Sequence, residues 1–365
     1  MKMLDNENRF EQRRAMNFAR KTTMFRPLSA LAILALAAIA PQRAAAQITI
    51  NWALVENAGN APDLTSFGAV SYGYRIGKYE VLNSEYVAFL NAVAALDTFT
   101  LYNPSMATDA RGGILQAGGP GTFTYSLKAP GYANMPVVFV SFYDALRFAN
   151  WLQNGQLGPG TTETGTYTFT GPTTVGPRNV LTGNFYALAS EDEWYKAAYH
   201  QPAAQGGDAD NYWLYPTRSN VVPNSRTPPN GADANSGNFY RDDLIPNGFN
   251  GGYAVSQSTA FNNALNYLSA GGAYSLASSF YGTFDQGGNV FEWDEGISGP
   301  NRIERGGSWD QQETRLRATT RIGVPPGFEN YNLGFRVVLV PEPSAIGLIG
   351  AGLVILLVGR RFVSR

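Results

Sequence analysis

The pattern of apolar and polar positions predicts a few short amphipathic helices in the middle of the chain. A strand is expected at 74–81, and Asn83 or Ser84 is a suitable N-cap for a helix after it. Apolar residues then recur with the spacing of one helix face, at Tyr86, Phe89, Leu90 and Val93. This segment therefore predicts a strand followed by a helix that buries one face.

Two further helices are predicted from their first turns. Ser141 stands three residues before Asp144, and Ser190 stands three residues before Glu193. This is the spacing of a capping box, in which a hydroxyl and an acid satisfy each other's free backbone N–H groups. Apolar stripes follow both pairs, so we expect both helices to pack on one side of a sheet.

The predicted strands are short and separated by long polar connections. Strands are expected at 137–140, 302–309, 315–322 and 333–340, and 166–170 alternates like one arm of a hairpin. The stretches between the predicted elements are rich in Gly, Thr, Pro, Ala or Asn and show little periodicity; the longest are 97–134, 155–184 and 201–272. Loops of this length in a compact domain are usually functional regions. The pattern predicts an α+β fold with short strands, few helices and long ordered loops.

Both ends of the chain are typical of targeting segments. The apolar run 28–40 follows a basic stretch and precedes Ala44-Ala45-Ala46, so 1–46 is predicted to be a signal peptide and Gln47 the approximate mature start. At the other end, Pro341-Glu342-Pro343 precedes a short apolar run and Arg360-Arg361. This order resembles the PEP-CTERM sorting tail of Gram-negative bacteria, and an ordinary C-terminal anchor is the alternative.

These segments predict three parts and a location. Residues 1–46 form the signal, 47–340 the mature domain, and 341–365 the sorting signal with a short transmembrane helix. The tail resemblance implies an exosortase partner that processes the tail after transient anchoring in the inner membrane. The protein is then expected in the periplasm, on the outer surface or in the extracellular matrix of a Gram-negative bacterium.

Composition and charge limit the partners and the kinds of site that the chain can form. The whole chain has a net charge of −1, but its basic residues are concentrated at the ends, so residues 47–343 carry a net charge of −9. No nucleic-acid partner is expected for such a domain. The chain has no cysteine and one histidine, which excludes disulfides, thiolate metal sites, cysteine nucleophiles and multi-histidine metal sites within the chain.

Several motifs together resemble one protein family. They are YRIGKYEVLNSEYVAFLNAV, MPVVFVSFYDALRFANWL, YALASEDEWYKAAY, GTFDQGGNVFEW, RGGSW and NLGFRVV, in this order between residues 74 and 338. Their order and spacing resemble the formylglycine-generating, sulfatase-modifying-factor domain. The resemblance covers about 70–340 and implies that family's variant of the C-type-lectin-like fold.

The family's oxidase activity depends on two cysteines that follow the RGGS-aromatic motif and bind copper. The matching positions fall near Gln311 and Leu316. An amide and an aliphatic side chain provide no soft ligand and no thiol, so we expect no copper and none of this oxidation chemistry. Related iron-dependent sulfoxide synthases use histidines of an additional domain, which this chain lacks.

The resemblance also implies structural calcium. In the family, the segment that matches 285–292 encloses a calcium ion, and the ligands here would be Asp285, the Gly288 and Val290 carbonyls, and Glu292. Oxygen ligands of this kind suit calcium. The alternative is that Asp285 and Glu292 cap a turn and pair with an arginine such as Arg305. A possible second calcium site maps onto Asn235, Ser236, Asn247 and Phe249.

A binding groove is the remaining functional expectation. The family's active-site cleft corresponds to residues that we expect to be exposed, namely Trp309, Asp310, Gln311, Gln312 and Arg315. An aromatic ring, a carboxylate and amides suit a polar or sugar ligand. Outside this cleft, His200 is expected at the surface, and Arg317 and Arg336 are expected to pair with buried carboxylates.

We therefore expect an exported, non-catalytic, calcium-stabilised domain that binds a polysaccharide, matrix component or protein through the loops at 201–280 and 305–315. One alternative is a divergent metal-dependent enzyme of the formylglycine-generating or nonheme-iron family that uses the same cleft. Another is a purely structural surface protein.

Overall fold

The computed structural model describes residues 47–179 and 181–341. The predicted signal peptide and almost all of the predicted sorting tail lie outside the described residues, so both stay predictions. Among the described residues, none of the helices has the length and apolar character needed to cross a membrane.

Three of the four α-helices are those that the pattern predicts. They are α1 (Asn83–Val93), α3 (Phe142–Gln153) and α4 (Glu191–Tyr199), and the short α2 (Ser105–Thr108) was not predicted. Short 3₁₀ helices are η1 (Pro130–Tyr132), η2 (Ala203–Gln205) and η3 (Glu313–Leu316). The capping boxes of α3 and α4 are both formed, as predicted.

The start of α1 differs from the prediction. Its N-cap is Leu82, whose backbone N–H donates to the Glu85 side chain at 2.9 Å. The Asn83 side chain is buried and donates instead to backbone carbonyls of the 132–136 segment. Asn83 therefore ties α1 to η1 and does not cap the helix.

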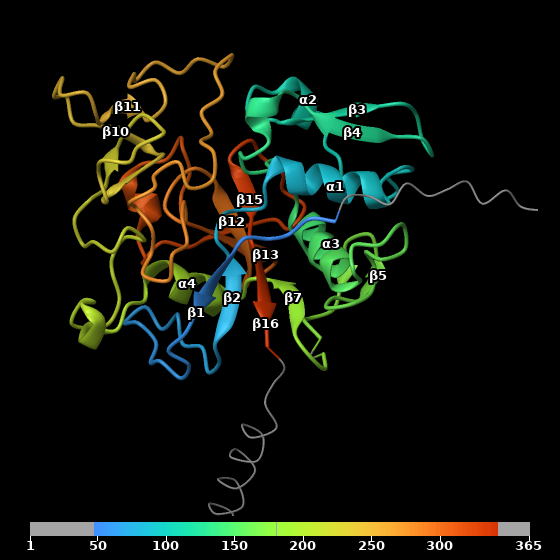
Figure 1. The fold of residues 1–365 in the computed structure, drawn as a ribbon, viewed down its shortest axis with the longest axis horizontal. Coiled ribbons are helices and arrows are strands. Elements are labelled where there is room, and N and C mark those ends of the chain that lie inside the picture. The colour runs from blue at the N-terminus through green and yellow to red at the C-terminus, as the bar shows by residue number, and fades with distance from the viewer. Residues whose placement is uncertain (1–46, 180, 342–365) are drawn as a thin grey trace, which may run out of the picture. The chain divides into compact units, whose positions relative to one another are not determined.

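A four-stranded antiparallel sheet, here called sheet A, gathers strands from both ends of the domain. Its order is β1 (Trp52–Val55), β2 (Tyr74–Gly77), β16 (Val337–Val340) and β7 (Phe185–Leu188). The last strand of the chain is thus central, between β2 and β7 (Figure 1). Helix α3 packs against β7 and buries its apolar face.

A second four-stranded sheet, sheet B, carries the region of the predicted calcium and cleft residues. Its order is β14 (Ile322–Val324), β13 (Asn301–Arg305), β12 (Phe291–Ser298) and β15 (Leu333–Phe335). The β12–β15 pair is parallel, and the other pairs are antiparallel. The predicted strand 333–340 is therefore two strands, which separate at Arg336 and join different sheets.

Other strand predictions were also wrong or too long. Residues 137–140 are buried but form no strand, and Phe139 has φ +62°. Residues 315–321 form the end of η3 and a loop. Leu316 and Ala318 are buried in two different hydrophobic clusters, and not on one face of a strand. The strands predicted at 74–81 and 302–309 are shorter than expected and end at Gly77 and Arg305.

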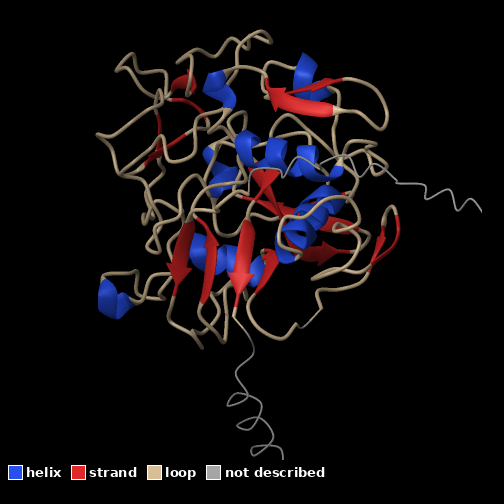
Figure 2. Cartoon of the chain, turned by 45° about the vertical axis from the view of Figure 1, so that its right-hand side comes forward, coloured by secondary structure: helices blue, strands red, loops and turns tan. Residues whose placement is uncertain are grey.

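Four small strand pairs lie within the long connections. They are β3 (Ile114–Ala117) with β4 (Thr124–Leu127), β5 (Phe169–Gly171) with β6 (Thr174–Val175), β8 (Asn224–Ser225) with β9 (Ser236–Gly237), and β10 (Tyr240–Asp242) with β11 (Gly251–Tyr253). Figure 1 shows α2, β3 and β4 on one flank and β10 and β11 on the other. Most of the remaining chain is loop (Figure 2).

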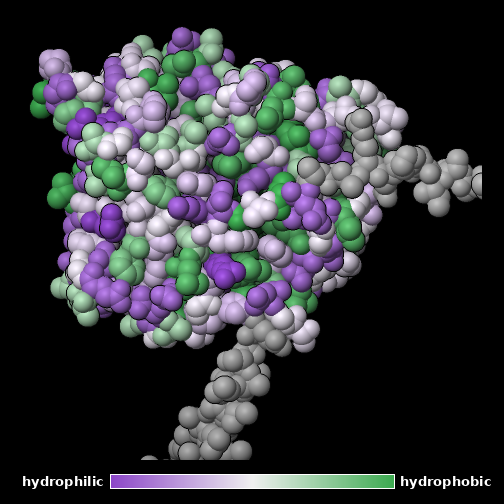
Figure 3. Space-filling view, viewed as in Figure 1, coloured by the Kyte–Doolittle hydropathy of each residue, from purple (hydrophilic) through white to green (hydrophobic). Residues whose placement is uncertain are grey.

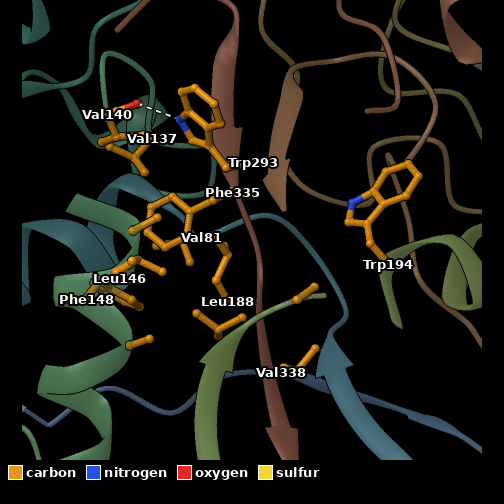
Figure 4. Packing of buried hydrophobic residues seen from close by; sticks show 14 of the residues in the cluster. Val81, Val137, Val140, Leu146, Phe148, Leu188, Trp194, Trp293, Phe335 and Val338 are labelled. Carbon is orange, nitrogen blue, oxygen red and sulfur yellow. Dashed lines mark hydrogen bonds between the residues drawn. The ribbon is translucent and has the colours of Figure 1, made fainter. Parts of the chain in front are cut away.

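One main core joins the two sheets and the helices. Leu146 and Phe148 of α3, Leu188 of β7 and Phe335 of β15 lie together in this core, and the Trp293 indole N–H of β12 donates to the Val140 carbonyl at 3.0 Å (Figure 4). On the face shown in Figure 3, hydrophobic residues are interspersed with hydrophilic ones.

Candidate functional site

The segment that follows β13 turns sharply at two glycines. Gly306 and Gly307 have φ of +94° and +75°, a conformation that L side chains rarely adopt. A Cβ at Gly306 would lie 2.7 Å from the Gln286 carbonyl oxygen. The turn thus requires glycine for its backbone conformation and for its close approach to the 285–292 segment.

Beyond the turn, residues 308–316 are fixed by polar contacts and by burial. The Ser308 hydroxyl donates to Asp310 at 2.6 Å, and the Tyr240 backbone N–H donates to the Gln311 carbonyl at 2.9 Å. Gln311 is half-buried, whereas Leu316 is buried against Tyr215 and Phe239. The two positions that matter for the family's oxidase chemistry hold an amide and a packed aliphatic side chain.

Trp309 is not exposed, contrary to expectation. Only 1% of its surface is accessible, and its ring stacks on Tyr267 with centroids 4.6 Å apart and planes 6° apart. Gln312 and Arg315 are exposed, and Asp310 and Gln311 are partly exposed. The cleft residues thus form a polar rim beside a buried tryptophan.

Trp309 is the centre of what we call the aromatic cluster: Tyr253, Phe261, Tyr267, Trp309 and Tyr331. Phe261 is 50% exposed, while Tyr253 and Tyr331 are half-buried. These rings come from β11, the loop at 261–267 and the segment before β15. The accessible aromatic surface next to the rim therefore belongs to Phe261 and the two tyrosines.

Glu304 of β13 is a buried acid near the rim residues Asp310 and Arg315, and its pKa is raised. Its residue is 6% exposed, and burial raises the pKa of its carboxyl to about 7, against the opposing effect of Arg315. Proton exchange near neutral pH is possible for such a group. Within the described residues, Glu304 makes no side-chain hydrogen bond to a nucleophile or base.

The predicted calcium ligand Glu292 has close partners in the protein. Its two carboxylate oxygens accept from Arg336 at 2.5 Å each, and the Trp194 indole N–H donates to it at 2.7 Å. The prediction that Arg336 pairs with a buried carboxylate is thereby confirmed. The alternative that Glu292 pairs with an arginine therefore holds, with Arg336 in the place of Arg305, which pairs with Glu191 at 2.6 Å.

Asp285 lies at the same buried place as Glu292. Its carboxylate accepts from the Gly272 N–H at 2.6 Å, and burial raises its pKa to about 6. Glu80 is also buried; one of its oxygens accepts from Asn289 at 3.0 Å, and the other has no hydrogen-bond partner. Burial and the Asp285 carboxylate both raise the pKa of Glu80. Three carboxylates thus interact with one guanidinium, that of Arg336.

This arrangement fits a cation in its charge and its donor chemistry. The unpartnered Glu80 oxygen and the excess of negative charge both favour one. In the described part of the chain, no three acidic, histidine or cysteine side chains come close enough to hold a metal ion by themselves. A calcium ion here would therefore depend on backbone carbonyls, such as those of Gly288 and Val290, as well as on carboxylates.

The second predicted calcium set is spread over two segments. Asn235 accepts from the Thr217 hydroxyl, and the Ser236 hydroxyl accepts from Asn230, whereas Asn247 accepts from the backbone N–H of Phe249. Arg226 pairs with Asp233 at 2.8 Å and stacks on Phe249 at 4.1 Å. A guanidinium thus supplies positive charge between these segments, as Arg336 does beside Glu292 in the first set, and the second site stays a prediction.

Two other sequence expectations were wrong. His200 is buried, not exposed; its Nδ1 lies 2.7 Å from the Tyr281 hydroxyl, and burial lowers its pKa to about 4. Arg317 lies 3.9 Å from Glu313 and donates to the Tyr215 hydroxyl at 3.0 Å, so it pairs with no buried carboxylate within the described residues.

Three further residues of the site were not predicted from the sequence. Glu80 carries a weak signal, since it is an acid next to a run of apolar residues. Arg111, whose guanidinium lies over three rings of the aromatic cluster, and Phe261 carry none, because both lie in loops without periodicity.

Comparison with known proteins agrees with the fold. Residues 68–340 match the family model of the sulfatase-modifying factor enzyme 1-like domain. The crystal structure of CarF is similar over 80% of this chain and 99% of that chain, with 18% identity and a TM-score of 0.50. At this identity the similarity concerns the fold alone, which is mixed α+β with short strands and few helices.

Two curated relatives are similar over a shorter stretch. Both are named inactive C-alpha-formylglycine-generating enzyme 2, one from Mus musculus and one from Bos taurus. Each is 30% identical over 159 residues. The match spans 41% of this chain and 41% and 42%, respectively, of the relatives.

Proposed function

This chain belongs to the family of the sulfatase-modifying factor enzyme 1-like domain, and on that premise we propose that it is an exported, non-catalytic domain that binds a polysaccharide. The observation that carries the proposal is the chemistry at the family's two cysteine positions. Gln311 and Leu316 offer no thiol there, and Leu316 is packed in a small core. The relatives named inactive support a role without catalysis.

The surface next to these positions supports a sugar ligand. The rim offers a carboxylate, amides and a guanidinium in Asp310, Gln311, Gln312 and Arg315, and the aromatic cluster offers the half-exposed ring of Phe261. Aromatic faces bind the apolar faces of sugars, while amides and charged groups bind hydroxyls. A rigid rim of this kind needs little ordering upon binding, because backbone contacts already hold it.

Export is part of the same proposal. The predicted signal peptide at 1–46 and the exosortase-processed tail at 341–365 would deliver the domain to the periplasm, outer surface or matrix. The net charge of −9 over residues 47–343 suits a soluble domain there. Polysaccharide would then be available as a ligand.

The binding claim is tested with the purified full-length chain on a glycan array and against matrix extract, with and without calcium. Arg315→Ala, which removes an exposed rim residue, is expected to weaken retention, whereas Arg75→Ala, an exposed arginine on sheet A, is the matched control. Retention by proteins alone would identify a protein ligand and overturn the polysaccharide claim. Retention by neither would overturn binding altogether.

We further propose that calcium stabilises the domain at Asp285, the Gly288 and Val290 carbonyls, and Glu292. The support is the excess of buried carboxylates over arginine at this place. Extracellular calcium modules bind with dissociation constants of about 10⁻⁴ to 10⁻³ M. At calcium about tenfold above that constant, the free energy of unfolding would increase by about 1.4 kcal/mol.

Chelation with EDTA is therefore expected to lower the melting temperature by a few degrees, measured by differential scanning fluorimetry. Asp285→Asn removes one ligand charge, so this variant should be insensitive to EDTA. It should also melt above the calcium-free wild type, because it relieves carboxylate repulsion. Glu56→Gln removes an exposed charge elsewhere and should keep the full calcium response. Identical wild-type melts in EDTA and in excess calcium would disprove the site.

A further inference from the structure

A groove beside α2 is formed by three segments that are far apart in sequence. Its walls are α2 with the following 109–110 segment, the end of β4 with η1, and the loop at 262–264. The groove has a volume of about 850 Å³ and is open to solvent. This volume lies within the range of about 300 to 1,000 Å³ that is typical of ligand sites. We call it the α2 groove.

Arg111 fixes two of these walls relative to each other. Its guanidinium pairs with Asp109 at 2.7 Å and donates to the carbonyl and side-chain oxygens of Asn263 at 3.0 to 3.2 Å. Arg111 is only 2% exposed, and it lies over the rings of Phe261, Trp309 and Tyr331 at 5.1 to 5.8 Å. Arg111 is thus a positioning residue, and the loop at 262–264 is held in place before any ligand arrives.

The third wall is tied to the first by two hydrogen bonds. The Lys128 ammonium donates to the Asp109 carbonyl at 2.7 Å, and the Tyr132 hydroxyl donates to the Ala110 carbonyl at 3.0 Å. All three walls therefore meet at the 109–111 segment. A groove held in this way binds without a large entropic cost of ordering.

The charge of the groove is positive and local. Arg111 neutralises the Asp109 carboxylate, whereas Lys128 makes no salt bridge within the described residues. An ammonium has three donors, and Lys128 uses one of them on a carbonyl. The other two donors can bind a carboxylate of a ligand in the groove.

The remaining lining is polar and uncharged. The Ser105 hydroxyl and the Asn263 amide nitrogen donate no hydrogen bond to protein within the described chain, and the Tyr132 ring lies 5.7 Å from the Lys128 ammonium. Hydroxyls, amides and one aromatic ring suit a hydroxyl-rich ligand. We propose that the α2 groove binds an acidic oligosaccharide, in which Lys128 Nζ donates to a uronate carboxylate.

This inference rests on the proposed function for the class of ligand, and it adds a second contact surface. The α2 groove and the cleft rim both adjoin the aromatic cluster, since Arg111 lies over its rings and Trp309 directly precedes the rim residue Asp310 in the chain. A polysaccharide long enough to cross the cluster would contact both surfaces. Short acidic oligosaccharides should then distinguish the groove from the rim.

The test is isothermal titration of the full-length chain with a short oligogalacturonate and with an uncharged maltooligosaccharide of the same length, at fixed calcium. Oligogalacturonate is expected to bind, and binding should weaken when ionic strength rises from about 0.01 M to about 1 M. Lys128→Gln should lose roughly tenfold or more in affinity, the size expected for a charge-assisted hydrogen bond.

A second variant tests whether any loss of binding comes from the groove and not from misfolding. Thr108→Glu places a negative charge at an exposed position of the groove and should reduce binding of oligogalacturonate as Lys128→Gln does. Thr319→Glu adds the same charge at an exposed position outside it and should bind like wild type. Melting temperatures of all variants should remain within a few degrees of wild type.

The outcomes separate this inference from the proposed function. Equal affinity for the two oligosaccharides, no binding of either, or no effect of Lys128→Gln and Thr108→Glu would overturn the groove. If Arg315→Ala still weakened polysaccharide retention in that case, the proposed function would stand without the groove. If Arg315→Ala also left polysaccharide retention unchanged, both the groove and the proposed function would be overturned.

Discussion

Arg336→Met is expected to lower the free energy of unfolding by about 3 to 5 kcal/mol, or to prevent folding. Breaking a buried ion pair by removing one partner leaves an uncompensated charge, and this is the usual size of that effect. Here the methionine leaves Glu292, Glu80 and Asp285 buried without their guanidinium. It also leaves the Gly77 and Phe284 carbonyls without the donor that they have at 2.9 and 3.0 Å.

Urea denaturation followed by tryptophan fluorescence measures this loss. Arg75→Met is the matched control, because Arg75 is exposed on β2 and forms no ion pair within the described residues; it should cost less than about 0.5 kcal/mol. Adding Glu292→Gln to Arg336→Met should restore part of the stability, because it removes one buried charge. If the two arginine variants have similar midpoints, the buried carboxylates are not held by Arg336.

Trp309→Ala is expected to lower the free energy of unfolding by about 3 to 5 kcal/mol, the range for removing a large buried aromatic side chain. The side chain is almost fully buried and stacks on Tyr267. Its loss would also remove a support of Arg111 and so loosen the α2 groove. An exposed tryptophan that only contacted a ligand would cost little on substitution.

Phe261→Ala is the control within the same cluster, since Phe261 is 50% exposed and should cost less than half as much. Trp309→Phe should fall between the two, because it keeps an aromatic ring of smaller volume. Urea midpoints of the three variants give the order directly. A Trp309→Ala variant as stable as wild type would mean that this side chain reaches solvent and that the aromatic cluster is looser than described.

The helices were predictable because their signals are local. Ser141 with Asp144 and Ser190 with Glu193 fix where α3 and α4 begin, whatever the remainder of the chain does. The segment at 333–340 shows the opposite case. It is apolar almost throughout, and nothing in it indicates that Arg336 separates two strands of different sheets. Only the position of Glu292 in the folded protein explains that break.

The residue types of the candidate site could be predicted from the sequence, but the solvent exposure of their side chains could not. The resemblance indicated the 305–316 segment and the absence of its thiols. The burial of Trp309 depends on Phe261 and Tyr267, which come from a loop without periodicity. The pairing of Glu292 with Arg336 also joins residues 44 positions apart, so the sequence indicated the two charges but not which partner each would find.

The central place of β16 has a consequence for folding. Sheet A has β2 and β7 on either side of a strand formed by the last described residues, so it cannot close until Val337–Val340 are available. Both pairings of this strand join residues far apart in sequence, 262 or 264 positions for β2 and about 150 for β7. Sheet A therefore depends on non-local contacts, which form late and slow the folding of a domain.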